Sequence, residues 1–155
     1  MQTGHTLAVR RAVAADHVRL AALLSDMQAH YGSPDPPGGA VEMARLLTRP
    51  GERLPFALIA ERHGTLLGLA SLSPVLFGGA FQWMLFLQDL YVTAAARSLG
   101  VGRALLAAAA RTALEGIIAA STGRPTPPTR APSASMTGWA CRARTNASIA
   151  WPVVT

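Results

Sequence analysis

The chain has 155 residues, of which 50% are hydrophobic and 14% are charged, and its formal net charge is +6. This length predicts one domain and excludes a two-domain enzyme. The mean hydropathy of +0.28 excludes disorder of the whole chain, because disordered chains combine low hydrophobicity with high charge.

The predicted elements follow in chain order: a strand over 6–12, a helix over 14–30, a short helix over 41–47, strands over 56–62, 65–73 and 81–92, and a helix over 103–114. The first helix is predicted from apolar residues spaced at i, i+3, i+4 and i+7, namely Leu20, Leu23, Leu24 and Met27. His63-Gly64 is a hairpin-turn dipeptide between two strands. This order predicts an α/β layer fold with a mainly antiparallel sheet.

The uncharged stretch 65–88 is long enough to cross a membrane. A Ser-Pro pair and a Gly-Gly pair interrupt it, and its glutamines would be unsatisfied in lipid, so a buried β-hairpin is the better interpretation. The first residues lack the apolar core of a signal peptide. The single Cys141 excludes an internal disulfide and a cysteine-based metal cluster. We therefore expect a cytoplasmic protein with no metal and no membrane contact.

A glycine-bearing loop at 97–102 opens the last helix. Gly100 and Gly102 remove side chains where backbone could approach a ligand, and free N–H groups at a helix start favour an anion such as pyrophosphate. Arg97 and Arg103 could add charge-assisted hydrogen bonds. The alternative is that the glycines only permit a tight turn. The third glycine of a dinucleotide fingerprint and the Gly-Lys-Ser/Thr of a P-loop are both missing.

The sequence Arg-x-x-Gly-x-Gly at 97–102, between a strand and an Ala/Leu-rich helix, resembles the acetyl-CoA site of the GCN5-related N-acetyltransferases, the GNAT family. The resemblance covers about residues 6–115 and implies a mixed, mainly antiparallel sheet flanked by helices. It also implies acetyl-CoA as co-substrate, a small-molecule amine as acceptor, and a homodimer as one assembly to test. Ser98 stands where a glycine is common in the family.

The resemblance implies a set of site residues. Backbone groups of Leu90, Tyr91 and Val92 would follow the pantetheine arm, and those of 97–102 would hold the pyrophosphate. The expected cofactor-binding residues are Leu90, Tyr91, Val92, Arg97, Ser98, Leu99, Gly100, Val101, Gly102 and Arg103. Asp89 is the candidate general base. The alternative, weighed evenly, is that Asp89 makes a structural hydrogen bond at an irregularity of the strand. Tyr31 and Gln88 are candidate substrate residues, although Tyr31 could equally be a packed loop anchor.

Within the family, 29–32 and 85–92 look most like the diamine (spermidine/spermine) acetyltransferase branch. That branch usually has glutamate where this chain has Gln88, which cannot accept a proton as a base. Two further groups are given structural interpretations. The histidines at 5, 17, 30 and 63 lack two-ligand spacing and are expected to be solvated, and Phe81, Trp83 and Phe86 are expected in the core.

The chain is expected to divide into an acetyl-CoA-binding domain over 1–115 and an irregular, basic, Pro-rich tail over 116–155. The tail holds four arginines and no acidic residue, phenylalanine or tyrosine. The family would need a fifth strand and a fourth helix here, with an asparagine and a Phe-Tyr pair whose tyrosine protonates the CoA thiolate. The fold is therefore expected to lack its last strands and helix.

A sharper interpretation of the tail is translation out of frame after about Glu115. Because each shifted codon takes two bases from a printed codon, GC-rich codons permit 116–140 to be reread as GHHRGIDWTADTPNARAIRFYDGLG. Met136-Thr137 can then give only Asp, and Trp139-Ala140 only Gly. The reread string resembles the missing family segment, including its Asn and Phe-Tyr pair.

The leading functional hypothesis is an N-acetyltransferase that moves an acetyl group from acetyl-CoA to a primary amine of a small molecule. A CoA-binding protein with impaired catalysis is the first alternative, since the thiolate acid is absent from the printed tail. Nucleic-acid binding through the tail arginines is the second, and scattered arginines without stacked aromatics argue against it.

Overall fold

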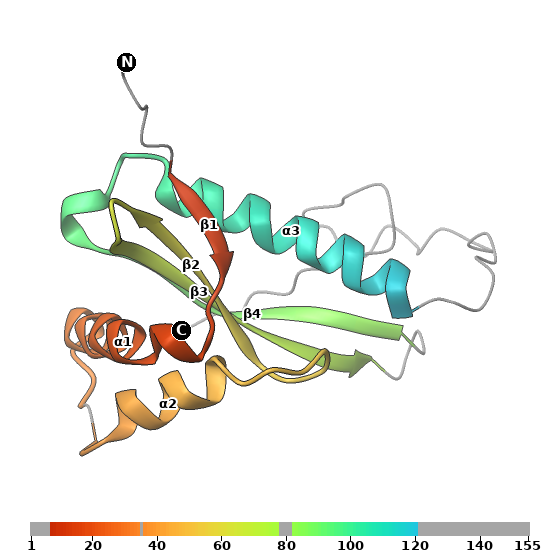
Figure 1. Cartoon of the computed structure of the whole chain (residues 1–155), viewed down its shortest axis with the longest axis horizontal. Coiled ribbons are helices and arrows are strands. Elements are labelled where there is room, and N and C mark those ends of the chain that lie inside the picture. Colours follow the sequence, from red (N-terminus) through yellow and green to blue (C-terminus); the bar gives the residue numbers. More distant parts are fainter. Residues whose placement is uncertain (1–6, 35, 78–81, 121–155) are drawn as a thin grey trace, which may run out of the picture.

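The computed structural model describes residues 7–34, 36–77 and 82–120 (Figure 1). Its strands are β1 (Ala8–Arg11), β2 (Phe56–Arg62), β3 (Thr65–Phe77) and β4 (Gln82–Val92), and its α-helices are α1 (His17–Tyr31), α2 (Gly39–Leu47) and α3 (Val101–Ala120). Short 3-10 turns, η1 (Ala14–Asp16) and η2 (Ala94–Ala96), precede α1 and the glycine loop. The predicted order of elements is confirmed over these residues, whereas Cys141 and the rest of 121–155 lie outside them.

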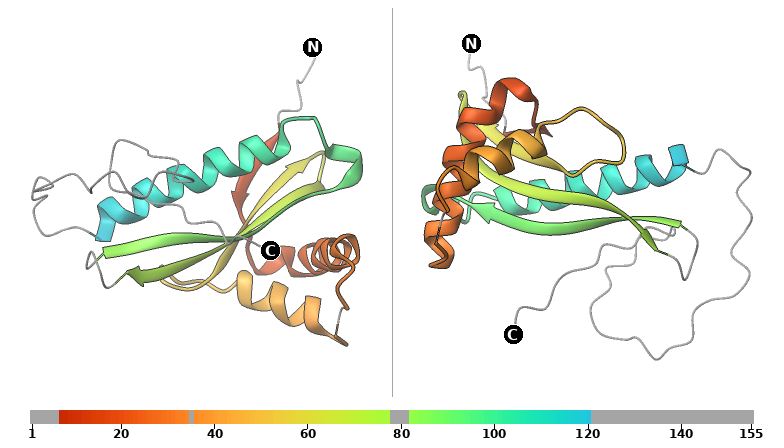
Figure 2. Two further views of the ribbon diagram at one scale, coloured as in Figure 1. Left: turned by 180° about the vertical axis from the view of Figure 1, so that it is seen from behind. Right: turned by 90° about the horizontal axis from the view of Figure 1, so that it is seen from below.

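The strands form one antiparallel sheet in the order β1-β2-β3-β4. Helices α1 and α2 cover one face and α3 crosses the other, so that the sheet is the middle of three layers (Figures 1 and 2). Each strand pairs with the strand next to it in sequence. This arrangement confirms the predicted antiparallel sheet flanked by helices.

The turn between β2 and β3 confirms the predicted hairpin at His63-Gly64. Both residues have positive φ, 53° and 74°, which is the backbone of the turn that matches the twist of two antiparallel strands. The turn places the start of β3 at the same end of the sheet as the end of β4, because Gly68 lies opposite Val92.

Helix α1 buries the face that its sequence spacing predicts. Leu20, Leu23, Leu24 and Met27 are all buried and belong to one cluster with Ile59 of β2. Burying each such side chain stabilises the fold by about 1.5–3 kcal/mol relative to leaving it in water. The apolar spacing is therefore sufficient to dock α1 on the sheet.

Helix α3 packs closely on the other face of the sheet through Val101, Leu105 and Ala109. Gly68 of β3 leaves room for this approach, because a Cβ there would lie 3.3 Å from both Val101 Cγ1 and Leu105 Cδ1. Helix α3 also begins earlier and ends later than predicted, and it continues beyond residue 115 to Ala120. Its first turn is therefore fixed directly beside the end of β4.

The aromatic residues of β4 are not the core that was predicted. Trp83 and Phe86 are only half-buried, and Phe81 lies outside the described residues. Leu85 and Leu87 are buried on the face of α3, and Tyr91 is buried on the face of α1. The Arg53 guanidinium instead lies over the Trp83 ring, with its Cζ 4.7 Å from the ring centroid.

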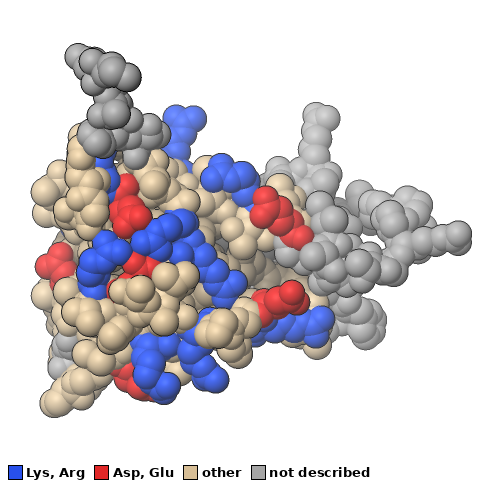
Figure 3. All heavy atoms as spheres, viewed as in Figure 1, with Lys and Arg blue, Asp and Glu red and all other residues tan. Residues whose placement is uncertain are grey.

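An ion-pair cluster joins β1, α1 and β2. The Asp16 carboxylate, only 2% exposed, accepts hydrogen bonds from Arg10 at 2.7 and 2.9 Å and from Arg19. Arg10 also donates to Glu61 at 2.9 Å. The Arg10 guanidinium is the main cause that holds the pKa of Asp16 well below its usual range. Acidic and basic side chains are accordingly interspersed on this face of the molecule (Figure 3).

Candidate active site

A β-bulge interrupts the pairing of β3 with β4 at the predicted site. Ser71 lies opposite Asp89 and Leu72 opposite Leu87, so Gln88 is an extra residue in β4. A bulge bends its strand and redirects the residues beside it. The sequence analysis singled out both Gln88 and Asp89, and the structure places them at this irregularity.

The bulge is held by hydroxyl groups from β3. Ser71 Oγ donates to Asp89 Oδ2 at 2.5 Å and accepts from the Asp89 backbone N–H at 3.1 Å. Ser73 Oγ donates to Gln88 Oε1 at 2.7 Å. Ser71 is buried, whereas Gln88 is exposed. Asp89 therefore makes the structural hydrogen bond that was one of its two interpretations, and this bond does not occupy its Oδ1.

Beyond the bulge, the outer edge of β4 offers unpaired backbone groups. The Thr93 N–H donates to Leu67 O at 3.0 Å, which sets the phase of the β3–β4 ladder. Because alternate residues of an antiparallel strand face their partner, Tyr91 faces β3 while Leu90 and Val92 face the opposite edge. Within the described residues, no strand pairs with that edge. The N–H groups of Leu90 and Val92 and the carbonyl of Leu90 are thus available there to an extended ligand, whereas the carbonyl of Val92 accepts from Arg97 Nε.

The glycine loop connects the end of β4 to the start of α3. The first α-helical hydrogen bond of α3 runs from Ala104 N to Gly100 O at 3.0 Å. The N–H groups of Val101, Gly102 and Arg103 precede it and are available to a ligand. The positive end of the helix dipole lies at the same point and favours an anion. Loop and helix together are therefore a candidate anion site that continues the outer edge of β4.

The two loop glycines have different structural reasons. Gly100 has φ of 79°, a conformation that costs other residues energy, so the turn itself requires it. Gly102 has no such φ, and a Cβ there would meet only Val92 Cγ2 at 3.7 Å. The fold alone does not require Gly102. The space that it leaves fits a ligand backbone or phosphate that approaches the helix start.

Ser98 takes the left-handed conformation that a glycine would adopt, with φ of 64°. It is exposed, and the resemblance described above implies a glycine at this position. The loop therefore keeps its shape at this position although the residue has changed, at a cost of about 1–2 kcal/mol in backbone energy.

The Arg97 side chain turns back toward α1. Its Nε donates to Val92 O at 3.3 Å, and its Nη2 lies 3.3 Å and 3.4 Å from the two ring nitrogens of His30. The His30 ring also lies 5.8 Å from the ring of Tyr91 and 5.5 Å from that of Tyr31. His30 is exposed, as predicted, and it also contacts Arg97 and both tyrosines.

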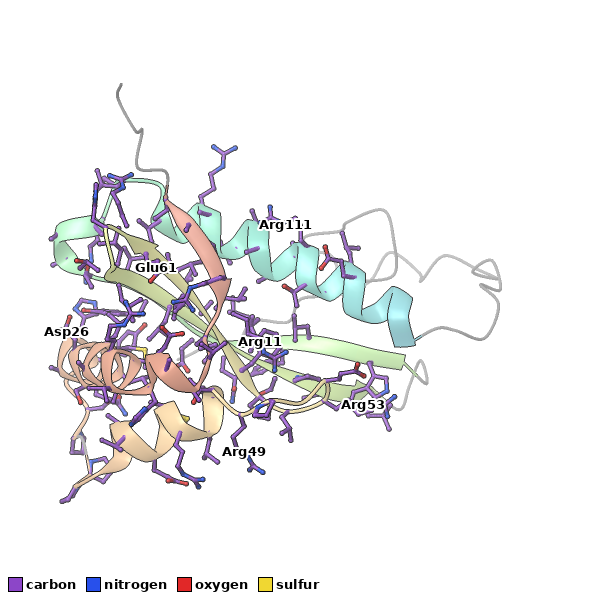
Figure 4. The ribbon with its side chains drawn as sticks, in the orientation of Figure 1. Arg11, Asp26, Arg49, Arg53, Glu61 and Arg111 are labelled. Carbon is purple, nitrogen blue, oxygen red and sulfur yellow. The ribbon has the colours of Figure 1, made fainter. Side chains whose placement is uncertain are left out.

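Tyr91 joins β4 to α1. Its side chain is 5% exposed, and its hydroxyl donates to Asp26 Oδ2 at 2.9 Å. Burial is the main cause that raises its pKa, and the Asp26 carboxylate raises it further. Figure 4 shows Asp26 on α1, at the same end of the sheet as the glycine loop. The sequence analysis singled out the backbone of Tyr91 for the pantetheine arm, but it did not indicate Asp26 as the partner of its hydroxyl.

A hollow separate from the bulge and the glycine loop lies between α1 and the β2–β3 hairpin. Its lining includes Arg19, Leu23, Asp26, Ala29, Thr65 and Leu66. No residue of β4 or of the glycine loop lines it, so it is separate from the bulge. In the part of the chain that the structure describes, no cluster of acidic, histidine or cysteine side chains could hold a metal ion. No helix among those residues is long and apolar enough to span a membrane.

The sequence model of the acetyltransferase (GNAT) family matches residues 20–129 of this chain. The chain belongs to the GNAT family of acetyltransferases. The match includes the bulge, the outer part of β4 and the glycine loop. No curated protein matches the sequence significantly.

Solved structures share this GNAT fold. A ribosomal-protein-alanine N-acetyltransferase from Brucella melitensis biovar Abortus 2308 is 22% identical with a TM-score of 0.61, covering 72% of this chain and 74% of that chain. An aminoglycoside N-acetyltransferase in complex with CoA is 18% identical with a TM-score of 0.59, and 74% of each chain is covered. An integron cassette protein from the Cole Harbour Salt Marsh metagenome is 19% identical with a TM-score of 0.64, covering 81% and 91%.

Proposed function

We propose that this GNAT protein transfers the acetyl group of acetyl-CoA to a primary amine of a small molecule. The observation that carries the proposal is the continuity of the bulge, the outer edge of β4 and the glycine loop. These three features would bring a candidate general base, an extended backbone edge and an anion site into one continuous line. The similar structures named above include proteins whose names describe acetylation of amines, which supports an amine acceptor.

The cofactor residues are proposed in two groups. Leu90 and Val92 would hydrogen-bond the pantetheine arm through their outward-facing backbone, with Tyr91 between them. The pyrophosphate would contact backbone N–H groups at the start of α3. The remaining proposed contacts come from the loop and the first turn: Arg97, Ser98, Leu99, Gly100, Val101, Gly102 and Arg103.

The chemical step would be direct attack of a neutral amine on the thioester carbon in a ternary complex. A C–N bond forms and the C–S bond breaks, which leaves an amide and CoA. The Leu90 N–H, unpaired at the outer edge, would stabilise the oxyanion that develops on the carbonyl oxygen. Asp89 would accept the ammonium proton, directly or through water, and the thiolate would take a proton from solvent.

The acceptor class is proposed to be small amines of the diamine type. Asp89 supports this class because a carboxylate attracts a second ammonium group. Its Oδ1 is available, and no Arg side chain among the described residues forms an ion pair with it. Gln88 and Tyr31 are proposed substrate contacts, since Gln88 is exposed at the bulge and Tyr31 is 56% exposed at the end of α1. Because Gln88 replaces the usual glutamate of that branch, recognition would depend on Asp89. We propose the cytoplasm as the place of action.

An acceptor screen tests this function. The purified protein is incubated with acetyl-CoA and with putrescine, spermidine, an aminoglycoside and a peptide with an N-terminal alanine, and products are identified by mass. We expect acetylated diamine that appears only with both substrates. Acetylation of the aminoglycoside or peptide alone would retain the transferase and contradict the diamine assignment. Binding of CoA without any acetylated amine would instead support the catalytically impaired alternative.

We further propose that the domain boundary lies near residue 115 and that the following residues are translated out of frame. The support is compositional: the printed tail lacks the family's Phe-Tyr pair, and the shifted reading supplies one. Helix α3 passes through the proposed boundary to Ala120, and the family match extends to residue 129. The reading is tested by sequencing the gene and measuring the intact mass. An uninterrupted frame around codon 115 would contradict it.

A further inference from the structure

We propose that Ser71 is a positioning residue of the acetyl-transfer site, because its hydroxyl fixes both the backbone and the carboxylate of Asp89 at the β4 bulge. This inference rests on the proposed function in assigning Asp89 and Leu90 to the chemistry. Ser71 itself lies on β3, outside every motif that the sequence analysis identified. Its role follows from its place opposite the bulge.

The Ser71 hydroxyl uses both of its hydrogen-bonding capacities on one residue. It donates to Asp89 Oδ2 and accepts from Asp89 N–H. Ser71 is 3% exposed, so water does not readily replace it. A carboxylate that accepts such a bond keeps one rotamer, and its second oxygen, Oδ1, keeps one direction. Ser71 thereby aims the proposed base.

The same contact also holds the backbone of the bulge. A regular ladder would pair Asp89 with the main chain of Ser71, but the extra residue Gln88 displaces the strand locally. The serine hydroxyl supplies an acceptor for the Asp89 N–H in this displaced backbone. Leu90 follows directly, so the direction of its outward N–H depends on how Asp89 is held. Ser71 therefore positions both groups proposed for the reaction without touching either substrate.

Ser73 provides a contrast on the same strand. It donates to the side chain of Gln88 but contacts no backbone group of the bulge, and Gln88 is exposed. Removing the Ser73 hydroxyl thus removes one exposed side-chain bond and leaves the Asp89 backbone held. Ser71 therefore holds the backbone of Asp89, and Ser73 does not.

The test compares Ser71→Ala, Ser71→Thr and Ser73→Ala with the wild-type protein in two measurements. The first is amide hydrogen exchange at Asp89, which needs no substrate. We expect Ser71→Ala to accelerate exchange about tenfold or more, the loss of about one buried hydrogen bond. Ser71→Thr retains a hydroxyl and should exchange as the wild type does, as should Ser73→Ala. Unchanged exchange in Ser71→Ala would overturn the inference.

The second measurement separates CoA binding from turnover on the amine that the acceptor screen identifies. Ser71→Ala should lose much less CoA affinity than turnover, because the loop and Val92 still hold the cofactor, while kcat falls about ten- to hundredfold, and Ser71→Thr should restore kcat. Full kcat in Ser71→Ala, or an equal fall in CoA affinity, would overturn the positioning role. If the wild type acetylates no amine, the proposed function fails separately, and the exchange measurement alone decides whether Ser71 holds Asp89.

Discussion

The hydroxyl of Tyr91 donates a hydrogen bond to Asp26 at 2.9 Å and so joins the strand that forms the proposed cofactor edge to helix α1. The two residues are 65 positions apart in sequence. The side chain of Tyr91 is buried against α1, whereas the backbone groups of Leu90 and Val92 face the outer edge of the sheet. The phenol therefore anchors the strand from the side opposite α3.

Tyr91→Phe tests this anchor. The variant loses one hydrogen bond to a carboxylate, so we expect the free energy of unfolding at pH 7 to fall by about 1–2 kcal/mol. Tyr31→Phe is the matched control, because Tyr31 is 56% exposed and should change stability little. Since the raised pKa of Tyr91 favours the protonated phenol, the difference should persist below about pH 10 and decrease only above it. Equal denaturation midpoints for both variants would contradict the anchor.

Gly102→Ala should separate cofactor binding from folding. Its Cβ meets only Val92 at 3.7 Å, and alanine is the better helix former, so stability should stay equal or rise by up to about 1 kcal/mol. Affinity for CoA should nevertheless fall, because the methyl group enters the space proposed for the pyrophosphate. Calorimetric titration measures the affinity and thermal unfolding measures the stability.

Gly100→Ala is the contrasting control for that experiment. Its φ of 79° makes any side chain strained, and we expect a loss of about 1 kcal/mol or more in stability. If Gly102→Ala bound CoA with wild-type affinity, the assignment of the helix start to the pyrophosphate would be wrong.

Ser98→Gly should stabilise the protein. Glycine removes the left-handed strain at φ of 64°, and after its larger unfolded-state entropy is subtracted, a gain of about 0.5 kcal/mol remains. Ser33→Gly, also at an exposed serine but without positive φ, should instead destabilise it. Chemical denaturation of the two variants gives the sign directly, and a loss of stability in Ser98→Gly would contradict the strain.

The buried Asp16 should make stability dependent on acid. Its pKa lies below the usual value, chiefly through Arg10, so the folded protein favours the charged form. This contribution is complete above about pH 5 and is lost as pH falls through the usual pKa of about 3.9 and below. Asp16→Asn should cost about 3 kcal/mol at pH 7 and flatten the acid limb of the stability curve.

Urea denaturation from pH 3 to pH 7 measures that difference. Glu42→Gln is a suitable control, because the Glu42–Arg45 pair is fully exposed and should affect stability little. Coincident stability curves for Asp16→Asn and the wild type would show that the cluster does not stabilise the fold.

Periodicity predicted most of the fold because burial on one face leaves a regular mark on sequence. The buried face of α1 was predicted in this way. The strand Phe56–Arg62 has five consecutive buried residues and no alternation, and it was predicted together with the turn at His63-Gly64. The strand from Thr65 was predicted to end near Ser73, since Pro74 lacks an N–H. The strand continues to Phe77 because Pro74 lies beyond the end of β2, which begins opposite Leu72. No residue of β2 therefore lies opposite Pro74 to accept the hydrogen bond that proline cannot donate.

The candidate site was predictable only where it has a local pattern. The glycine loop has one, and Gly100 and Gly102 were found from it. The bulge at Gln88, the Ser71–Asp89 bond and the Tyr91–Asp26 bond depend on which residues lie opposite each other across elements. A lone serine in an apolar strand carries no signal of that register. The resemblance to a family supplied the site's chemistry, but not the contacts that hold it.

The most direct test of the account is a backbone amide map of the protein during titration with CoA. We predict that the largest chemical-shift changes fall on Leu90 and Val92 of β4 and on the N–H groups of 98–103, with small changes at Ala22 and Thr65 beside the α1–hairpin hollow. The same map with acetyl-CoA should extend the changes at Leu90. Changes centred on Ala22 and Thr65, with Leu90, Val92 and the glycine loop unaffected, would contradict the proposed cofactor site.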